Sequence, residues 1–178
     1  MEKTLVFMKI TLFVITFFFT VPTFAQGVFI TPMVELSEVK DLIRLGYGGG
    51  AGIQLNRWLV GAYGVHIPKT TTDSQNLTLT FGGVWLEYQQ PATSYLSVNV
   101  ALKTAYGNAQ QQFDQTTEDD RIWLFTPEAG VAVSIGKYAQ LGYAAGYRIV
   151  GDLNLSELKN QDLYTLVSTL TLKIGRFQ

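Results

Sequence analysis

The sequence predicts an all-β fold, an eight-stranded antiparallel up-and-down transmembrane β-barrel, and three observations predict it. Apolar residues alternate with polar or small residues in eight separate runs. Most of these runs exceed the roughly 5–6 residues of an average globular strand, and the connections between them alternate between short and long. In the clearest run, residues 95–107, one face carries Leu96, Val98, Val100 and Leu102 and the other carries Ser97, Asn99, Ala101 and Lys103.

The first 25 residues are expected to be removed before the barrel forms. Lys3 and Lys9 precede an apolar stretch at residues 10–19, and Thr23 and Ala25 are small residues just before a cut at Gln26. This is the pattern of a secretory signal peptide. The alternative, an uncleaved anchor, would need about 20 consecutive apolar residues. We therefore expect a signal peptide over residues 1–25 and an outer-membrane β-barrel domain over residues 26–178.

The eight predicted strands cover residues 28–36, 43–55, 58–67, 77–88, 95–107, 121–135, 138–150 and 163–177. A tilted membrane strand needs about 9–11 residues, which most of these segments provide. Short connections at 56–57, 89–94 and 136–137 are interleaved with longer polar connections at 37–42, 68–76, 108–120 and 151–162. Bacterial membrane barrels have short periplasmic turns and longer extracellular loops. An even number of strands then places both chain ends on the short-turn side.

Two strands contain residues that disturb a regular ladder. The pair Gly82-Gly83 in residues 77–88 predicts a β-bulge, with a register shift between Phe81 and Val84. Pro127 donates no ladder hydrogen bond, so it predicts a second irregularity in residues 121–135.

Aromatic residues gather near both ends of the predicted strands, as they do at the two interfaces of a bilayer. The expected periplasmic girdle contains Trp58, Tyr88, Tyr95, Tyr138 and Phe177, and the outer girdle contains Tyr106, Trp123, Tyr147 and Tyr164.

The lumen is predicted to be a filled, salt-bridged polar core. We assign the more apolar face of each strand to lipid, which leaves glycine and alanine on the inward faces of residues 43–55 and 138–150. An eight-stranded barrel is just wide enough for side chains, and buried charges must be paired. A gated channel or a proton path is the alternative interpretation of these charges. The predicted lumen charge network contains Glu35, Arg44, Glu87, Lys103, Glu128, Arg148 and Lys173.

Composition excludes several classes of function. Thirteen Lys and Arg residues nearly balance fourteen Asp and Glu residues, for a formal net charge of −1, so no nucleic-acid partner is expected. The chain has no Cys and therefore no disulfide or thiol nucleophile. With one histidine, His66, and no ligand cluster, we expect neither a metal site nor a cofactor.

Two further features have a functional and a structural interpretation. His66 suits a serine hydrolase that modifies lipid only if a serine lies beside it, and an ordinary lumen or rim histidine is the simpler interpretation. The acidic residues of the segment 108–120 suit either a Ca²⁺ or lipopolysaccharide contact or a solvated, mobile loop, which we favour. The acidic residues are Asp114, Glu118, Asp119 and Asp120.

Three motifs carry a resemblance to a known family: FGGVWLEY at residues 81–88, GYAAGYRIVGD at 142–152 and LKIGRF at 172–177. With them, residues 26–178 resemble the small eight-stranded outer-membrane proteins that have the OmpA-type membrane domain architecture. The resemblance implies the outer membrane of a Gram-negative bacterium as the location. It also implies outer-membrane lipid, lipopolysaccharide and the barrel assembly machinery as partners, and a monomeric barrel.

We therefore expect a non-enzymatic outer-membrane barrel that serves membrane integrity or surface interaction through its loops. A soluble, lipocalin-like ligand-binding barrel is the second hypothesis, and it would need an apolar lumen and a polar outer surface. An outer-membrane lipid-modifying hydrolase that uses His66 is the third.

Overall fold

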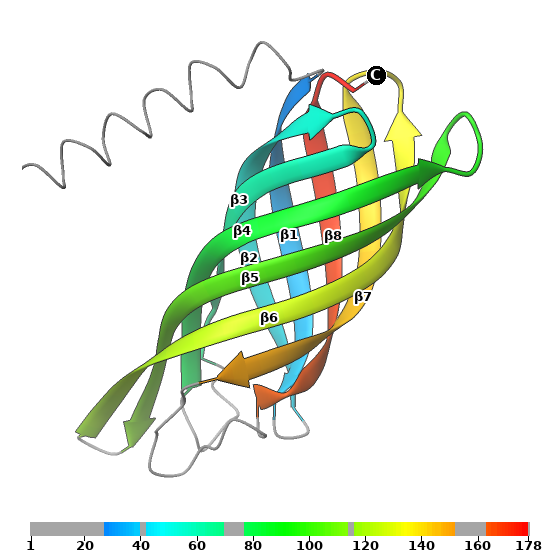
Figure 1. Ribbon diagram of the computed structural model, residues 1–178. Coiled ribbons are helices and arrows are strands. Elements are labelled where there is room, and N and C mark those ends of the chain that lie inside the picture. Colours follow the sequence, from blue (N-terminus) through cyan, green and yellow to red (C-terminus); the bar gives the residue numbers. More distant parts are fainter. Residues whose placement is uncertain (1–26, 40–41, 70–76, 114–115, 152–162, 178) are drawn as a thin grey trace, which may run out of the picture.

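A computed structural model describes residues 27–39, 42–69, 77–113, 116–151 and 163–177 as one closed eight-stranded antiparallel barrel. Each strand pairs with the next along the chain, and β8 pairs with β1, as Figure 1 shows. The predicted fold class is confirmed. The predicted signal peptide, residues 1–25, lies outside the described residues. The strands are β1 (Gly27–Val39), β2 (Leu42–Leu55), β3 (Trp58–Ile67), β4 (Leu77–Pro91), β5 (Leu96–Phe113), β6 (Thr116–Ile135), β7 (Ala139–Gly151) and β8 (Thr165–Gly175).

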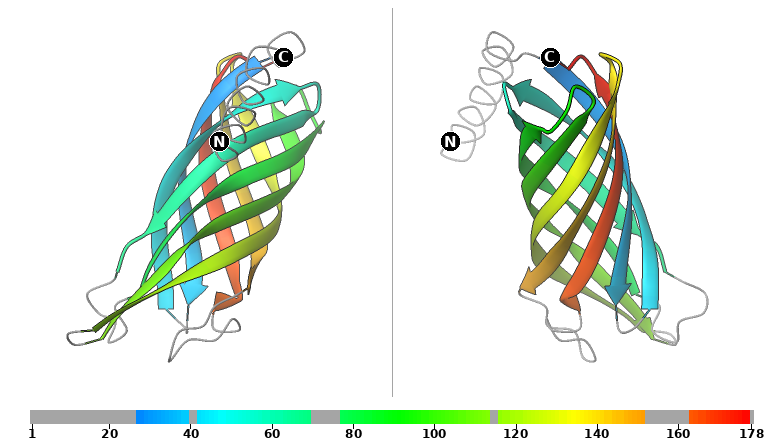
Figure 2. Two further views of the ribbon diagram at one scale, coloured as in Figure 1. Left: turned by 60° about the vertical axis from the view of Figure 1, so that its left-hand side comes forward. Right: turned by 90° about the vertical axis from the view of Figure 1, so that its right-hand side faces the viewer.

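The short turns gather at one end of the barrel. The β2–β3, β4–β5 and β6–β7 connections lie at the end where β1 begins and β8 finishes, at the top of Figures 1 and 2. Asn56, in the two-residue β2–β3 turn, and Gly136, in the three-residue β6–β7 turn, have φ angles of 59° and 67°, the left-handed conformation common in tight hairpin turns. We call this end the short-turn end and the opposite one the loop end.

The outward face of the barrel is apolar. Ile30, Leu102 and Leu166 are 58%, 50% and 69% exposed, and similar side chains follow one another around the whole wall. A water-soluble protein rarely exposes a continuous apolar surface of this extent, whereas lipid requires one. This is the reverse of a lipocalin-like barrel, whose outer surface would be polar. Within the described residues, no helix is long and apolar enough to cross a bilayer.

Exposed aromatic side chains lie at both rims of this belt. Trp58, Tyr95 and Tyr138 are exposed at the short-turn end, and Tyr88 packs beside Trp58 with 5.0 Å between ring centroids. Phe177 departs from the predicted girdle, because its ring packs 5.7 Å from the lumen residue Phe29. At the loop end the exposed rings include Tyr47, Tyr106, Trp123, Tyr147 and Tyr164.

The predicted loop over residues 108–120 is largely a strand extension. The β5–β6 ladder continues to the pair Phe113–Thr116, whereas β6 pairs with β7 only as far as Trp123. The hairpin therefore projects beyond the neighbouring strands, as Figure 1 shows at its lower left. Glu118, Asp119 and Asp120 belong to β6, and no group of three or more metal-ligating side chains occurs among the described residues. Asp114 lies outside those residues.

The two predicted irregularities have different outcomes. Gly82 and Gly83 pair in unbroken register with both β3 and β5, so the predicted bulge is wrong. Simple alternation therefore turns Phe81 and the preceding leucines of β4 into the lumen. At Pro127 the β6–β7 ladder is interrupted between Phe125 and Glu128 and resumes in the same register. The irregularity at Pro127 is therefore a gap in pairing without a register shift.

Inward-facing glycines on β2 and β3 make room for large rings in the lumen. A Cβ atom added at Gly61 would lie 2.4 Å from Cη2 of Trp85, and one at Gly50 would lie 2.9 Å from Cζ3 of the same ring. A Cβ at Gly52 would lie 2.8 Å from Cζ of Phe29. These glycines thus form a flat wall against which the indole of Trp85 and the ring of Phe29 pack.

The same strand offers a matched test of this packing. Gly61→Ala is expected to lower the free energy of unfolding by about 1–3 kcal/mol, because the added methyl overpacks the lumen. Gly64→Ala is the control, since the nearest atom to its Cβ is a backbone oxygen at 3.7 Å, and it should change stability by less than about 0.5 kcal/mol. Denaturant unfolding in detergent micelles measures both, and equal stability of the two variants would contradict the packing described.

Candidate functional site

The seven charged residues predicted for the lumen network all point inward from the barrel wall into the lumen. Each is only 3% to 8% exposed, although all seven side chains are ionisable. Six of them form three ion pairs, which follow one another along the barrel axis from the short-turn end to the loop end. In that order the pairs are Glu87–Lys173, Lys103–Glu128 and Glu35–Arg148, and the seventh residue, Arg44, lies nearest the loop end on β2.

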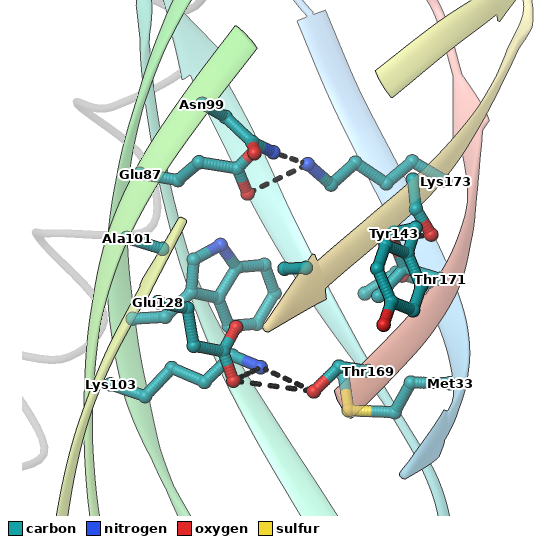
Figure 3. A pocket seen from close by; sticks show the side chains of 14 residues that line it. Met33, Glu87, Asn99, Ala101, Lys103, Glu128, Tyr143, Thr169, Thr171 and Lys173 are labelled. Atoms are coloured by element: carbon teal, nitrogen blue, oxygen red, sulfur yellow. Dashed lines mark hydrogen bonds and ion pairs between the residues drawn. The ribbon is translucent and has the colours of Figure 1, made fainter. Parts of the chain in front are cut away.

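The pair Glu87–Lys173 spans the full width of the lumen. Glu87 is on β4 and Lys173 is on β8, which are opposite each other in a ring of eight strands. Lys173 Nζ lies 2.5 Å and 2.7 Å from the two carboxylate oxygens of Glu87. Gln89 and Asn99 each donate a side-chain amide N–H to Glu87 Oε1 at 2.8 Å. Figure 3 shows Lys173 reaching across the lumen to Glu87, with Asn99 beside the carboxylate. We call this pair the cross-brace.

The second pair lies one layer deeper and joins neighbouring strands. Lys103 Nζ on β5 lies 2.7 Å from Glu128 Oε1 on β6. Thr169 on β8 donates its hydroxyl to the same oxygen at 3.2 Å. The dashed lines in Figure 3 join these three residues. A buried carboxylate is costly unless paired and hydrogen-bonded, and Glu128 has both kinds of partner.

The third pair lies towards the loop end. Arg148 Nη2 donates to Glu35 Oε1 at 2.5 Å, and the guanidinium carbon lies 4.9 Å from the centroid of the Phe81 ring. Arg44 Nη1 donates to the backbone oxygen of Leu77 at 2.6 Å. The guanidinium groups of Arg44 and Arg148 therefore both contact β4, one through a carbonyl oxygen and one through an aromatic face.

Part of the lumen is apolar, which differs from the wholly polar core predicted from the sequence. Residues of β1, β3, β4 and the loop-end parts of β5 to β7, with Leu163 just before β8, form a buried cluster that contains four aromatic rings, those of Phe29, Tyr63, Phe81 and Trp85. The rule that the more apolar face meets lipid fails on β3 and on the first half of β4. The signal was present, because unbroken alternation from Glu87 back along β4 places Trp85, Gly83 and Phe81 on the inward face.

The aromatic and charged halves of the lumen touch each other. Tyr63 packs edge-on against Phe81 and Trp85, with ring centroids 6.4 Å and 6.0 Å apart. Lys103 Nζ lies 5.8 Å from the Tyr63 centroid. Cations over ring faces are attracted by the ring quadrupole, so the aromatic wall supports the charges as well as filling space.

A small cavity lies between two of the ion-pair layers. The cavity drawn in Figure 3 has a volume of about 30 Å³ and is bordered by both the cross-brace and the Lys103–Glu128 pair. A water molecule needs roughly 10–15 Å³ of such space, so the cavity has room for one or two waters. A second, larger cavity of about 320 Å³ opens at the short-turn end.

His66 lies on the outward face near the loop end. One ring nitrogen, Nδ1, is 2.8 Å from Thr80 Oγ1, and the imidazole meets the Tyr47 ring edge-on at 5.5 Å between centroids. Its side-chain hydrogen-bond partner among the described residues is thus a threonine rather than a serine. Ser74, one serine of the neighbouring loop, lies outside the described residues. The position is that of a rim histidine.

Comparisons with solved structures agree with the barrel, while no family model and no curated protein matches the sequence. Neisserial surface protein A is similar with a TM-score of 0.66, 12% identity, and coverage of 84% of this chain and 95% of that one. The N-terminal β-barrel domain of Pseudomonas aeruginosa OprF has a TM-score of 0.64, 10% identity, and coverage of 85% and 98%. Ail, the attachment invasion locus protein of Yersinia pestis, has a TM-score of 0.54, 14% identity, and coverage of 84% and 97%.

Identities this low show the fold alone, and the apolar belt adds the location. A membrane β-barrel with short turns at one end and longer connections at the other is the architecture of bacterial outer membranes. The chain therefore has the fold of the small eight-stranded outer-membrane β-barrels and lies in the outer membrane.

Proposed function

We propose that this protein is a non-enzymatic outer-membrane barrel with a closed lumen, which serves membrane integrity or surface interaction through its extracellular side. The observation that carries the proposal is the cross-brace, because Glu87 and Lys173 meet from opposite walls. A side-chain bridge across the diameter blocks the axis of an eight-stranded barrel, whose interior is just wide enough for side chains.

Three further features support closure. The Lys103–Glu128 and Glu35–Arg148 pairs add further buried, paired side chains at deeper levels, although their strands are not opposite each other. The rings of Tyr63, Phe81 and Trp85 fill the remaining width. The internal cavity of about 30 Å³ is enough for one or two waters and too small for a hydrated ion. A gated channel would need these layers to move together.

The surface role rests on what projects outward at the loop end. The β5–β6 hairpin extends beyond the other strands and exposes Asp119 and Arg121. Two of the similar barrels carry names that refer to the surface and to attachment. A rigid paired hairpin presents side chains to a partner at lower entropic cost than a flexible loop does. The predicted loops over residues 70–76 and 152–162 lie outside the described residues.

The partners follow from the same surfaces. The apolar belt contacts outer-membrane lipid, and the aromatic rims lie at the level of the headgroups, including those of lipopolysaccharide. The barrel assembly machinery would insert the chain. All eight strands pair within one chain, so no sheet edge calls for a second copy, and we propose a monomer.

Closure is tested by electrical recording. The purified protein in planar bilayers is expected to give no stable conductance in the nanosiemens range, because the lumen holds no continuous water path. An open porin in the same bilayer is the positive control. Stable channels from the protein alone would overturn the closed lumen.

The cross-brace is tested by removing its charges singly and together. Lys173→Met leaves the buried Glu87 uncompensated and is expected to lower the free energy of unfolding by about 3–5 kcal/mol. Adding Glu87→Gln removes the stranded charge and keeps an acceptor for Gln89 and Asn99, so it should recover most of the loss. The control Lys69→Met, at an exposed site, should change stability by less than about 0.5 kcal/mol. A double variant no more stable than Lys173→Met would contradict the pairing.

The hydrolase alternative is tested at His66. Lipid A from a strain that expresses the protein is expected to have the same mass spectrum as lipid A from a strain that expresses His66→Ala or carries an empty vector. A modification that appears with the unsubstituted protein and disappears with His66→Ala would show that the protein is an enzyme.

A further inference from the structure

We propose that the cavity at the short-turn end binds a small anionic saccharide, a sugar acid or a sugar phosphate. We call this cavity the vestibule. Its volume of about 320 Å³ lies at the lower end of the range for small-molecule sites, roughly 300–1,000 Å³. It is bordered by all three short turns, through Arg57, Ser94 and Lys137 among others. Since short turns face the periplasm in such barrels, the ligand would be a periplasmic solute.

The floor of the vestibule is a built polar surface. Gln54, Gln89 and Gln140 line it and are only 5% to 6% exposed. Gln89 Nε2 donates to Glu87 at 2.8 Å and to Gln140 Oε1 at 3.4 Å, and Gln140 Nε2 donates to Ser134 Oγ at 3.5 Å. The carboxamides of Gln89 and Gln140 are therefore linked to the cross-brace beneath them, whereas Gln54 Nε2 donates to the backbone oxygen of Asn56 at 3.0 Å. Fixed amides and hydroxyls are the groups that recognise the hydroxyls of a sugar.

The rim of the vestibule is positively charged. Arg57 and Lys137 line it, and no Asp or Glu is among the described residues that do so. The Arg57 guanidinium donates to Gln90 Oε1 at 2.8 Å and to the Tyr88 hydroxyl at 3.3 Å, so these bonds hold it at the outer edge of the rim, beside the aromatic girdle. The nearest buried carboxylate beneath the floor, Glu87, is already paired with Lys173. Cations at the rim, with no carboxylate lining the vestibule in the described part of the chain, favour an anionic ligand over a neutral or cationic one.

One wall of the vestibule is aromatic. Phe177 lines it, half-buried, and is supported from below by the Phe29 ring at 5.7 Å. A sugar has an apolar face of C–H groups that can pack on such a ring, while its hydroxyls reach polar groups elsewhere. The combination of fixed amides, cations and one supported ring therefore fits a saccharide better than a bare anion.

The ligand class is tested by titrating the folded protein in detergent micelles and following its NMR spectrum. The probes are glucuronate, glucose 6-phosphate, glucose and inorganic phosphate. Both sugar anions are expected to bind at least about tenfold more tightly than glucose, because glucose lacks the charged group and so loses one charged hydrogen bond. They are also expected to bind about tenfold more tightly than inorganic phosphate, which lacks the sugar ring. If glucose binds as well as glucuronate, the anionic requirement is wrong. If inorganic phosphate binds as tightly as glucose 6-phosphate, the site recognises the anion and not the sugar, and the saccharide proposal is wrong. If neither sugar anion binds, the site itself is wrong.

Position is tested with matched lysine variants. Lys137→Gln removes a rim cation while keeping the backbone oxygen that accepts from Phe177 N at 3.0 Å, and it is expected to weaken glucuronate binding about tenfold. Lys69→Gln makes the same change of charge beyond β3 at the loop end and should leave binding unchanged. Equal weakening by both variants, or by neither, would overturn the placement in the vestibule. Heat-modifiable migration on gels checks that both variants fold.

Discussion

A bilayer offers no hydrogen-bond partner to the backbone, and the rest of this structure depends on that constraint. The sheet must therefore close, and it does so through the β1–β8 ladder, from the pair Phe29–Gly175 to the pair Ser37–Val167. Closing with eight strands fixes a narrow interior. Every inward side chain must then be packed or paired, so Glu87 meets Lys173 from the opposite wall instead of facing water.

Closure also separates two kinds of apolar surface that alternate along each strand. The outward one faces lipid and needs only to be apolar, with side chains such as Val98, Val100 and Leu102 exposed. The inward surface is close-packed, so the size of each side chain matters there. The rings of Phe29 and Trp85 fit because the wall they pack against carries glycine. The cations of the lumen join the two halves of this interior, since Lys103 and Arg148 each bind a carboxylate and face an aromatic ring.

Much of the fold could be predicted from period-two alternation, strand length and turn spacing, because these report directly on the two faces of a membrane strand. Hydrophobicity alone could not distinguish apolar residues that face lipid from apolar residues that pack in the lumen. The inward apolar residues of β3, such as Leu59 and Val65, were therefore not predicted. The polar segment 108–120 resembled a loop because a hairpin beyond the membrane needs no apolar face. The pairing of the lumen charges depends on which strands are opposite, which a linear sequence does not state.

The lumen contacts differ in how far apart their partners lie along the chain. Tyr63, Phe81 and Trp85 come from the adjacent strands β3 and β4, whereas the partners Glu87–Lys173 and Glu35–Arg148 are 86 and 113 residues apart. Local contacts form before distant ones, so the aromatic wall can assemble in a partial sheet whose charges are still hydrated. The pairing of β8 with β1 closes the sheet, and the same pairing holds Lys173 on the wall opposite Glu87. Closing the sheet and pairing this buried carboxylate are therefore one structural requirement.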